Sequence, residues 1–186
     1  MNCYGCKDLA QSFRTVRANT ITIAEEIPEE KYSFRPTPDT RSVGQLLTHI
    51  AIGPRLQQQV HKDERRTTLE GFNFPAFMQS VGAEELKPRS KAEILDLLKR
   101  EGEAWASWLE GLSDDFLAER VGMIPGTQPS SKTRFEMLLS PKEHEMHHRG
   151  QLMLIQRMIG QVPHLTRQMQ ERMAARAGQQ PAPSRV

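Results

Sequence analysis

The sequence of 186 residues has little cysteine, few aromatic residues and no excess of one charge. Its only two cysteines, Cys3 and Cys6, cannot supply the disulfide network of a small secreted domain, so a buried core has to stabilise the fold. The 25 Lys and Arg residues nearly balance the 23 Asp and Glu residues, which argues against a basic groove for nucleic acid. These totals predict an ordinary globular protein with no nucleic-acid partner.

Long apolar runs are also missing from the sequence. No segment approaches the roughly 20 apolar residues of a membrane span, and the first ten residues, MNCYGCKDLA, lack the apolar segment of a secretory signal. We therefore expect no membrane partner and a cytoplasmic location, where Cys3 and Cys6 would stay reduced. Their C-x-x-C spacing lacks the β-α-β context of a thioredoxin-like site, which favours incidental thiols.

Apolar residues do recur at helical spacing in four segments, which predicts amphipathic helices. These segments are residues 7–27, 42–60, 90–112 and 131–160. Ser42 or Thr40 is expected to cap the second helix, and Ser90 with Glu93 predicts a capping box at the third. Pro141 is expected either to start a new helix or to kink the last one.

Residues 61–89 separate the second and third helices and look irregular. Their charged run and their Gly and Pro content predict a long crossover with one short helical turn. We predict an all-α fold, a four-helix bundle over residues 1–162 with this long crossover connection between helices two and three. Residues 163–186 are expected to form a short helix, about residues 164–175, and a flexible tail.

Histidines are the most informative residues of the last helix. His144 and His148 are four residues apart, so their side chains stack on one helix face, and that face carries the apolar stripe. His49 falls on the apolar face of the second helix. Buried histidines at ligand spacing would each need a polar partner, so we predict that these three converge on one metal ion.

Three neutral imidazoles and one open position are the usual catalytic arrangement for zinc, and they also suit nickel, iron or manganese. A structural zinc site would close with a fourth protein ligand, often cysteine. We therefore expect one divalent ion, with zinc or nickel favoured, and a small-molecule substrate.

Three further polar residues are candidates for the site. Glu145 completes H-E-x-x-H with His144 and His148 and would be the general base of a zinc hydrolase, although the extended protease pattern and an edge strand for peptide are missing. Glu101 lies on the inward stripe of the third helix and is a candidate outer-shell acceptor or base. Gln151, one turn beyond His148, is a candidate contact for a bound cofactor or ligand.

Three segments resemble the DinB superfamily of metal-binding four-helix bundles. They are residues 34–39 (FRPTPD), 42–51 (SVGQLLTHIA) and 144–152 (HEMHHRGQL), and the last is the most specific. The resemblance covers most of the chain up to about residue 162. It implies a metal held by His49, His144 and His148, and a homodimer as the common state. Exposed leucines on the helices favour the same homodimer, namely Leu95, Leu109, Leu152 and Leu154.

The resemblance also implies a choice of activities. Such proteins carry out metal-dependent thiol transfer with bacillithiol, mycothiol or glutathione, or a mycothiol-dependent isomerisation, and many have no known activity. We interpret this chain first as a thiol S-transferase in which a metal-stabilised thiolate attacks an electrophilic small molecule. The alternatives are a non-catalytic metal-binding or stress-associated dimer, and a hydrolase with Glu145 or Glu101 as base.

Overall fold

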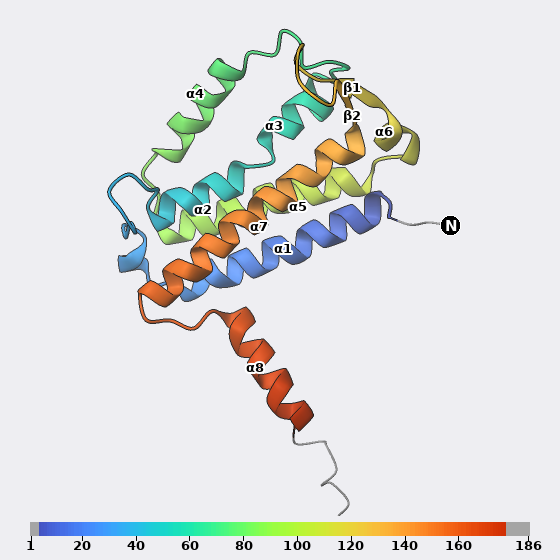
Figure 1. The fold of residues 1–186 in the computed structure, drawn as a ribbon. Coiled ribbons are helices and arrows are strands. Elements are labelled where there is room, and N and C mark those ends of the chain that lie inside the picture. Colours follow the sequence, from blue (N-terminus) through green and yellow to red (C-terminus); the bar gives the residue numbers. More distant parts are fainter. Residues whose placement is uncertain (1–3, 178–186) are drawn as a thin grey trace, which may run out of the picture.

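The computed structural model describes residues 4–177 and is mostly helical (Figure 1). Its long helices in the main body are α1 (Cys6–Glu26), α2 (Val43–Ile52), α5 (Lys91–Glu110) and α7 (Arg134–Met158). The other elements are a 3-10 turn (Glu29–Lys31), α3 (Arg55–Gln57), a π-helical segment (Gln58–Asp63), α4 (Phe74–Glu85), α6 (Asp114–Ala118), β1 (Arg120–Gly122), β2 (Ser131–Thr133) and α8 (His164–Ala177).

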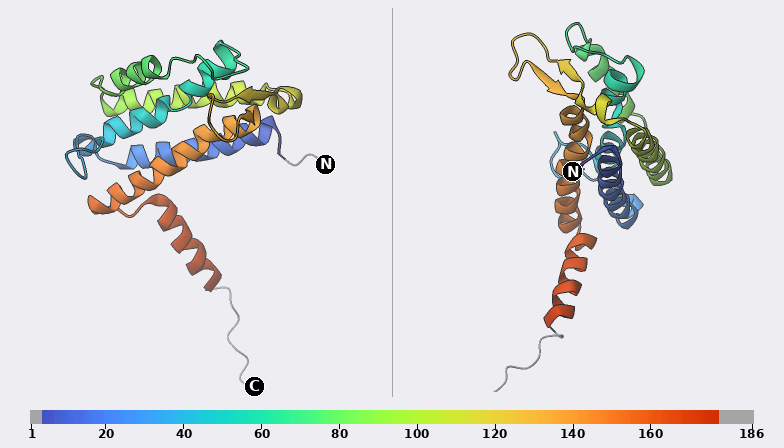
Figure 2. Two further views of the ribbon diagram at one scale, coloured as in Figure 1. Left: turned by 45° about the horizontal axis from the view of Figure 1, so that its top comes forward. Right: turned by 90° about the vertical axis from the view of Figure 1, so that its right-hand side faces the viewer.

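Helices α1, α2, α5 and α7 pack side by side around the core (Figures 1 and 2). α5 lies against both α1 and α2, and α7 also contacts both of them. Two clusters of buried apolar side chains fill the space between the helices. One cluster includes Ile50 and Leu98, and the other includes Phe13 and Trp105. The predicted apolar stripes therefore face a shared interior.

Capping boxes fix where three of these helices begin. In each box the side-chain oxygen of the capping residue accepts a hydrogen bond from the backbone N–H of the third helical residue. The side chain of that third residue accepts one from the backbone N–H of the capping residue, so two free N–H groups at the helix start are satisfied. The pairs are Ser42 with Gln45, Ser90 with Glu93, and Thr133 with Glu136. The predicted capping box at Ser90 is confirmed, and Ser42 rather than Thr40 caps α2.

The second helix is shorter than predicted, because Gly53 and Pro54 end α2 well before residue 60. Pro54 has no backbone N–H to donate to the carbonyl oxygen of Ile50. That oxygen accepts from the N–H of Gly53 at 3.2 Å and from Nη2 of Arg17 at 3.2 Å instead. Pro141 acts differently, since α7 continues through it as one helix and no new helix starts there.

Two expectations about the connections are wrong. The crossover is not mainly irregular, because the twelve-residue α4 occupies its second half, with Asn73 as cap and Pro75 in its first turn. The fold is also not purely helical. Strands β1 and β2 form a small antiparallel sheet in which Val121 pairs with Lys132. Each strand has only three residues, too few to give a period-two pattern in the sequence.

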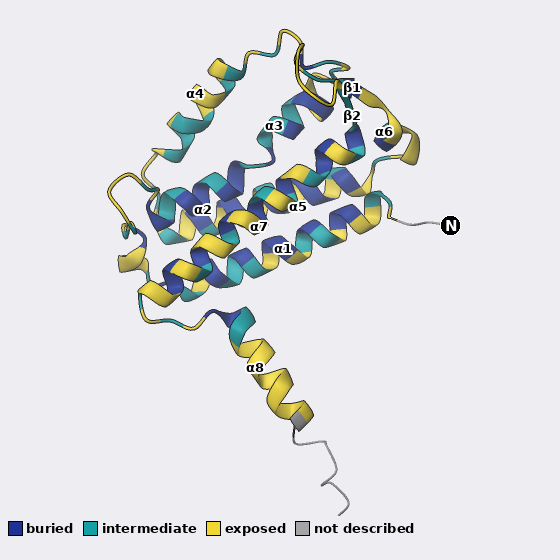
Figure 3. Cartoon of the chain, in the orientation of Figure 1, coloured by how far each residue is buried: buried dark blue, intermediate teal, exposed yellow. Residues whose placement is uncertain are grey.

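The helix expected near residue 164 is present as α8, which projects away from the other helices (Figures 1 and 2). Most of its side chains are exposed (Figure 3). Its first turns contact α1 through polar groups: Nε2 of His164 donates to Oδ1 of Asn19 at 3.2 Å, and Arg167 pairs with Glu26. Cys3 and residues 178–186 of the predicted tail lie outside the described residues. Across residues 4–177, no helix combines the length and the apolarity that a membrane span requires.

The leucines chosen for a dimer surface do not share one surface. Leu109 and Leu152 are fully buried in the core, so they cannot contact a partner. Leu95 is half-buried, and Leu154 is exposed. Each helix is buried over a wider face than the narrow apolar stripe in its sequence suggests. For this reason Leu109 and Leu152 were expected at the surface although they lie in the core. The homodimer itself stays a prediction.

A buried ion pair links the four packed helices at their centre. Arg17 of α1 donates from Nε to both carboxylate oxygens of Glu145 on α7, at 3.0 and 3.1 Å, and from Nη2 to Oε2 at 3.0 Å. Its Nη1 donates to the carbonyl oxygen of Leu98 on α5 at 2.8 Å, and the contact with Ile50 reaches α2. Both charged side chains are at most 4% exposed. Gly102 makes room for Arg17, because a Cβ there would lie 2.8 Å from its Cγ.

We expect Arg17→Met to destabilise the protein by about 3–5 kcal/mol, because it leaves the Glu145 carboxylate buried without a partner. The double variant Arg17→Met/Glu145→Leu removes both charges and should lose less. Urea unfolding measures both. Arg14→Met is the matched control on the same helix, since Arg14 pairs with Glu103 nearer the surface and should contribute roughly 1 kcal/mol or less. Equal losses at positions 14 and 17 would contradict this assignment.

Candidate metal centre

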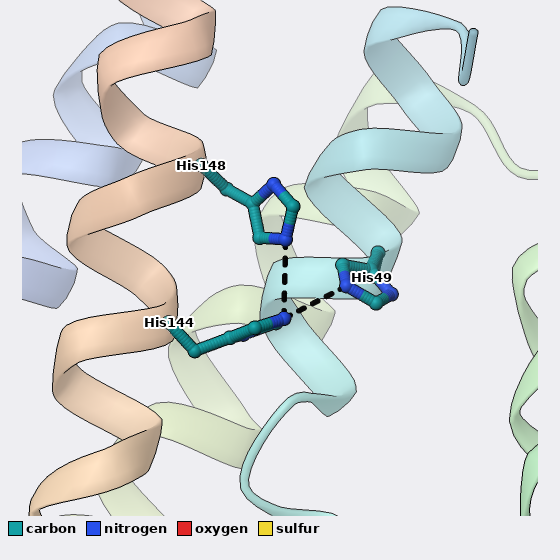
Figure 4. A group of neighbouring side chains, drawn as sticks. All are labelled: His49, His144 and His148. Atoms are coloured by element: carbon teal, nitrogen blue, oxygen red, sulfur yellow. Dashed lines mark hydrogen bonds between the residues drawn. The ribbon is translucent and has the colours of Figure 1, made fainter.

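Three imidazoles meet between α2 and α7 (Figure 4). His49 comes from α2, while His144 and His148 come from successive turns of α7. Nε2 of His144 lies 2.9 Å from Nε2 of His49 and 3.1 Å from Nε2 of His148. His148 is buried and the other two are half-buried. The structure thus brings together the three histidines that the sequence predicted as metal ligands.

The hydrogen bonds of the Nδ1 atoms decide whether each Nε2 atom carries a proton or a lone pair. Nδ1 of His49 lies 2.5 Å from Oε1 of Glu85, and Nδ1 of His148 lies 2.8 Å from Oε1 of Gln151. Both oxygens accept, so both Nδ1 atoms carry the proton and both Nε2 atoms present a lone pair. Nε2 of His144 has at most one proton, which can form a hydrogen bond to only one of these two lone pairs. At least one pair of nitrogens therefore faces each other with no hydrogen between them.

This arrangement fits a cation ligated by all three nitrogens. Two nitrogens bound to one ion at about 2.05 Å lie about 2.9 Å apart when the nitrogen–metal–nitrogen angle is a right angle, and about 3.3 Å apart when it is tetrahedral. The two separations from Nε2 of His144, 2.9 and 3.1 Å, fall in this range, and all three ligand atoms lie within 4.8 Å of one another. Burial lowers the pKa of all three imidazoles, and in His144 burial and the positive neighbours lower it to about 4. The rings are therefore neutral at pH 7, which is the form that binds a metal.

Glu85 of α4 is the residue that the sequence reasoning missed. Burial raises the pKa of its carboxyl, but hydrogen bonds with Arg41 and His49 outweigh burial and lower it overall, so Glu85 is ionised. Nε of Arg41 donates to its Oε2 at 2.7 Å while its Oε1 holds His49. A carboxylate behind a ligand histidine fixes the ring and raises its basicity. No local pattern marks Glu85, because only the packing of α4 against α2 brings it there.

Gln151, predicted as a ligand contact, lies directly behind His148. Its Oε1 accepts from Nδ1 of His148, and its Nε2 lies 3.2 Å from Nε2 of His147. Gln151 therefore does for His148 what Glu85 does for His49, without adding charge. It also lines a pocket of about 700 Å³ into which His148 faces.

The two predicted carboxylates lie elsewhere. Glu145 is 1% exposed and its hydrogen bonds go to Arg17, so its carboxylate is engaged in the buried ion pair and not in the histidine group. Oε1 of Glu101 accepts from Nη2 of Arg55 at 3.1 Å. Among the described residues, the group that could share one ion holds three histidines and no carboxylate. The spacing in H-E-x-x-H fixes the two histidines but not the direction of the residue between them.

Gly53 leaves the space that the His144 ring needs at the end of α2. A Cβ at position 53 would lie 3.1 Å from Nδ1 of His144, closer than side chains normally approach. The break after α2 therefore has two effects: Gly53 makes room for the ring, and Pro54 frees the carbonyl oxygen that Arg17 binds.

Comparison with known proteins agrees with the fold. Residues 12–152 match the family model described as the DinB superfamily. A DinB-like protein from Bacillus subtilis is 22% identical, with a TM-score of 0.60 over 83% of this chain and 92% of its own. A protein from Clostridium difficile 630, described as uncharacterized, is 14% identical, with a TM-score of 0.66 over 83% of this chain and 97% of its own. At these identities the likeness concerns the fold alone. Curated proteins give no match.

His144→Ala should remove stoichiometric binding of a divalent metal, because the central nitrogen of the group is lost. His147→Ala is the matched control: the neighbouring imidazole is exposed and lies outside the group. Metal content per chain after dialysis against Zn²⁺ or Ni²⁺, in protein purified without a histidine tag, measures the difference. Equal metal content in the two variants would rule out this centre.

Glu85→Gln should weaken metal binding by about 10–100-fold, because the amide keeps the shape of the side chain but loses the charge behind His49. Glu84→Gln is the control on the same helix, since Glu84 pairs with Lys87 and Arg89 instead. Competition with a chromophoric chelator gives both affinities. If the two variants matched, Glu85 would have no role behind the ligand.

Proposed function

Since this chain belongs to the DinB superfamily, we propose that α1, α2, α5 and α7 form a four-helix bundle whose three histidines hold one divalent ion. The observation that carries the proposal is the meeting of three Nε2 atoms, of which Glu85 and Gln151 force two to present lone pairs. A cation satisfies all three nitrogens at once, whereas a proton satisfies only one contact. Zinc and nickel suit three imidazoles best.

We propose that the centre supports thiol S-transfer to an electrophilic small molecule. A divalent ion on three neutral histidines would keep its full charge and so favour a thiolate over a thiol at neutral pH. The sulfur forms a bond to the electrophilic carbon. The electron pair displaced from that carbon leaves with the halide of an alkyl halide, and the thiol proton then passes to solvent. In an epoxide the pair stays on the ring oxygen, in an activated alkene it moves to the adjacent carbon, and that atom takes up a proton. The protein's own contribution is to orient the ligands through Glu85 and Gln151, and to hold the thiol beside the electrophile in the pocket next to His148.

Two alternatives differ in what they require. A non-catalytic metal-binding or stress-associated dimer needs the three histidines but no substrate pocket, whereas the pocket beside His148 is large enough for a small molecule. A hydrolase needs a base near the ion, and both carboxylates considered for that role are engaged with arginines. The geometry therefore supports thiol transfer better than either alternative.

Turnover by the metal-loaded protein should depend on an added thiol and saturate with it, yielding a conjugate detectable by mass spectrometry. The assay uses a panel of an epoxide, an alkyl halide and an activated alkene, with His144→Ala as the metal-free control. Ester or amide cleavage that proceeds without thiol and is inhibited by it would favour the hydrolase. No turnover of any substrate by fully loaded protein would favour the non-catalytic dimer.

A further inference from the structure

The pocket beside His148 has a chemical character of its own. We propose that it selects a small molecule with an apolar body and an anionic end, and that Arg35 recognises the anionic end. This inference rests on the proposed function, because it assigns a class of ligand to the same site. Three observations support it: the residues that line the pocket, the ion pairs that its charged residues make, and the net charge of the lining.

Two kinds of wall enclose the pocket. His148 and Gln151 place it next to the candidate metal centre. Apolar side chains from four parts of the chain also line it, namely Pro36, Leu46, Leu86, Leu154 and Ile155. Leu154 is 60% exposed, so this part of the lining presents an apolar surface to solvent. A volume of about 700 Å³ bounded by both apolar and polar side chains suits a small molecule.

Four charged residues line the pocket, and they differ in how far they are already paired. Arg41 is committed to Glu85, which also holds His49. Asp39 accepts a hydrogen bond from the hydroxyl of Thr37 at 2.6 Å. Within residues 4–177, Arg35 makes no ion pair, and its one hydrogen bond runs from Nη1 to the carbonyl oxygen of Thr40. Arg35 therefore keeps donors available for an anion.

The sum of charges favours an anionic ligand once the histidines hold a divalent ion. The two arginines and the two carboxylates cancel, and the three imidazoles are neutral, so the ion alone leaves the lining at a net charge of two positive. A ligand whose sulfur meets the ion at the histidines and whose anionic group meets Arg35 would find positive charge at both ends and apolar side chains between them. Asp39 opposes this attraction, which gives the proposal a second test of opposite sign.

The experiment uses the full chain loaded with Co²⁺ and two probes of equal length, 6-mercaptohexanoate and 6-mercaptohexan-1-ol. Charge-transfer absorption between thiolate and cobalt reports binding of each. We expect the carboxylate to bind about tenfold more tightly than the alcohol, with Arg35→Gln removing that ratio. Arg35→Lys should keep part of it, and Asp39→Asn should increase it. Added salt should reduce the ratio, because the pocket is open to solvent.

Three failures are distinguishable. If both thiols give charge-transfer absorption but bind equally, the anionic specificity is wrong while the proposed thiol chemistry stands. If the carboxylate's advantage survives Arg35→Gln, Arg35 is not the residue that recognises the anionic end, and the assignment to Arg35 is wrong. If neither thiol gives the absorption although cobalt is bound, both the proposed function and this inference are overturned.

Discussion

The ion pair between Arg17 and Glu145 is the contact on which the arrangement of the helices depends. Burying a guanidinium and a carboxylate is costly unless every donor and acceptor finds a partner. Here the guanidinium reaches the carboxylate on α7 and main-chain oxygens on α2 and α5. Ile50, which supplies the oxygen on α2, directly follows His49, and Glu145 directly follows His144. The Arg17 side chain of α1 therefore fixes the positions of α2 and α7 relative to each other, next to the histidines that they carry.

Proline and glycine residues make room for this contact and for the histidines beside it. Pro54 removes the donor that would otherwise occupy the carbonyl of Ile50, and Gly102 lets Arg17 lie flat against α5. Gly53 lets the His144 ring approach the end of α2. None of these residues touches a ligand of the site through its side chain. Each acts by what it leaves out, an N–H or a methyl group.

Periodicity predicted the packed helices and the three histidines because both depend on which residues share a helix face. It failed where structure comes from distant contacts. α4 has no buried residue, so it leaves no apolar stripe to detect, and Glu85 reaches His49 only after α4 has packed on α2. Glu145 shows the limit of a motif: its place between two ligands suggested a base, while a residue 128 positions earlier decides its direction.

The site therefore combines two elements of different stability. The ligands lie on helices that are locked into the core, but the carboxylate that orients His49 lies on α4, whose side chains are at most half-buried. Elements with few buried contacts open at low free-energy cost. Glu85 and Leu86, at the end of this helix, also line the pocket beside His148. A molecule that fills the pocket would thus lie against Glu85, the same residue that holds His49. Binding of the molecule and the basicity of the His49 ring therefore both depend on the position of Glu85 at the end of α4.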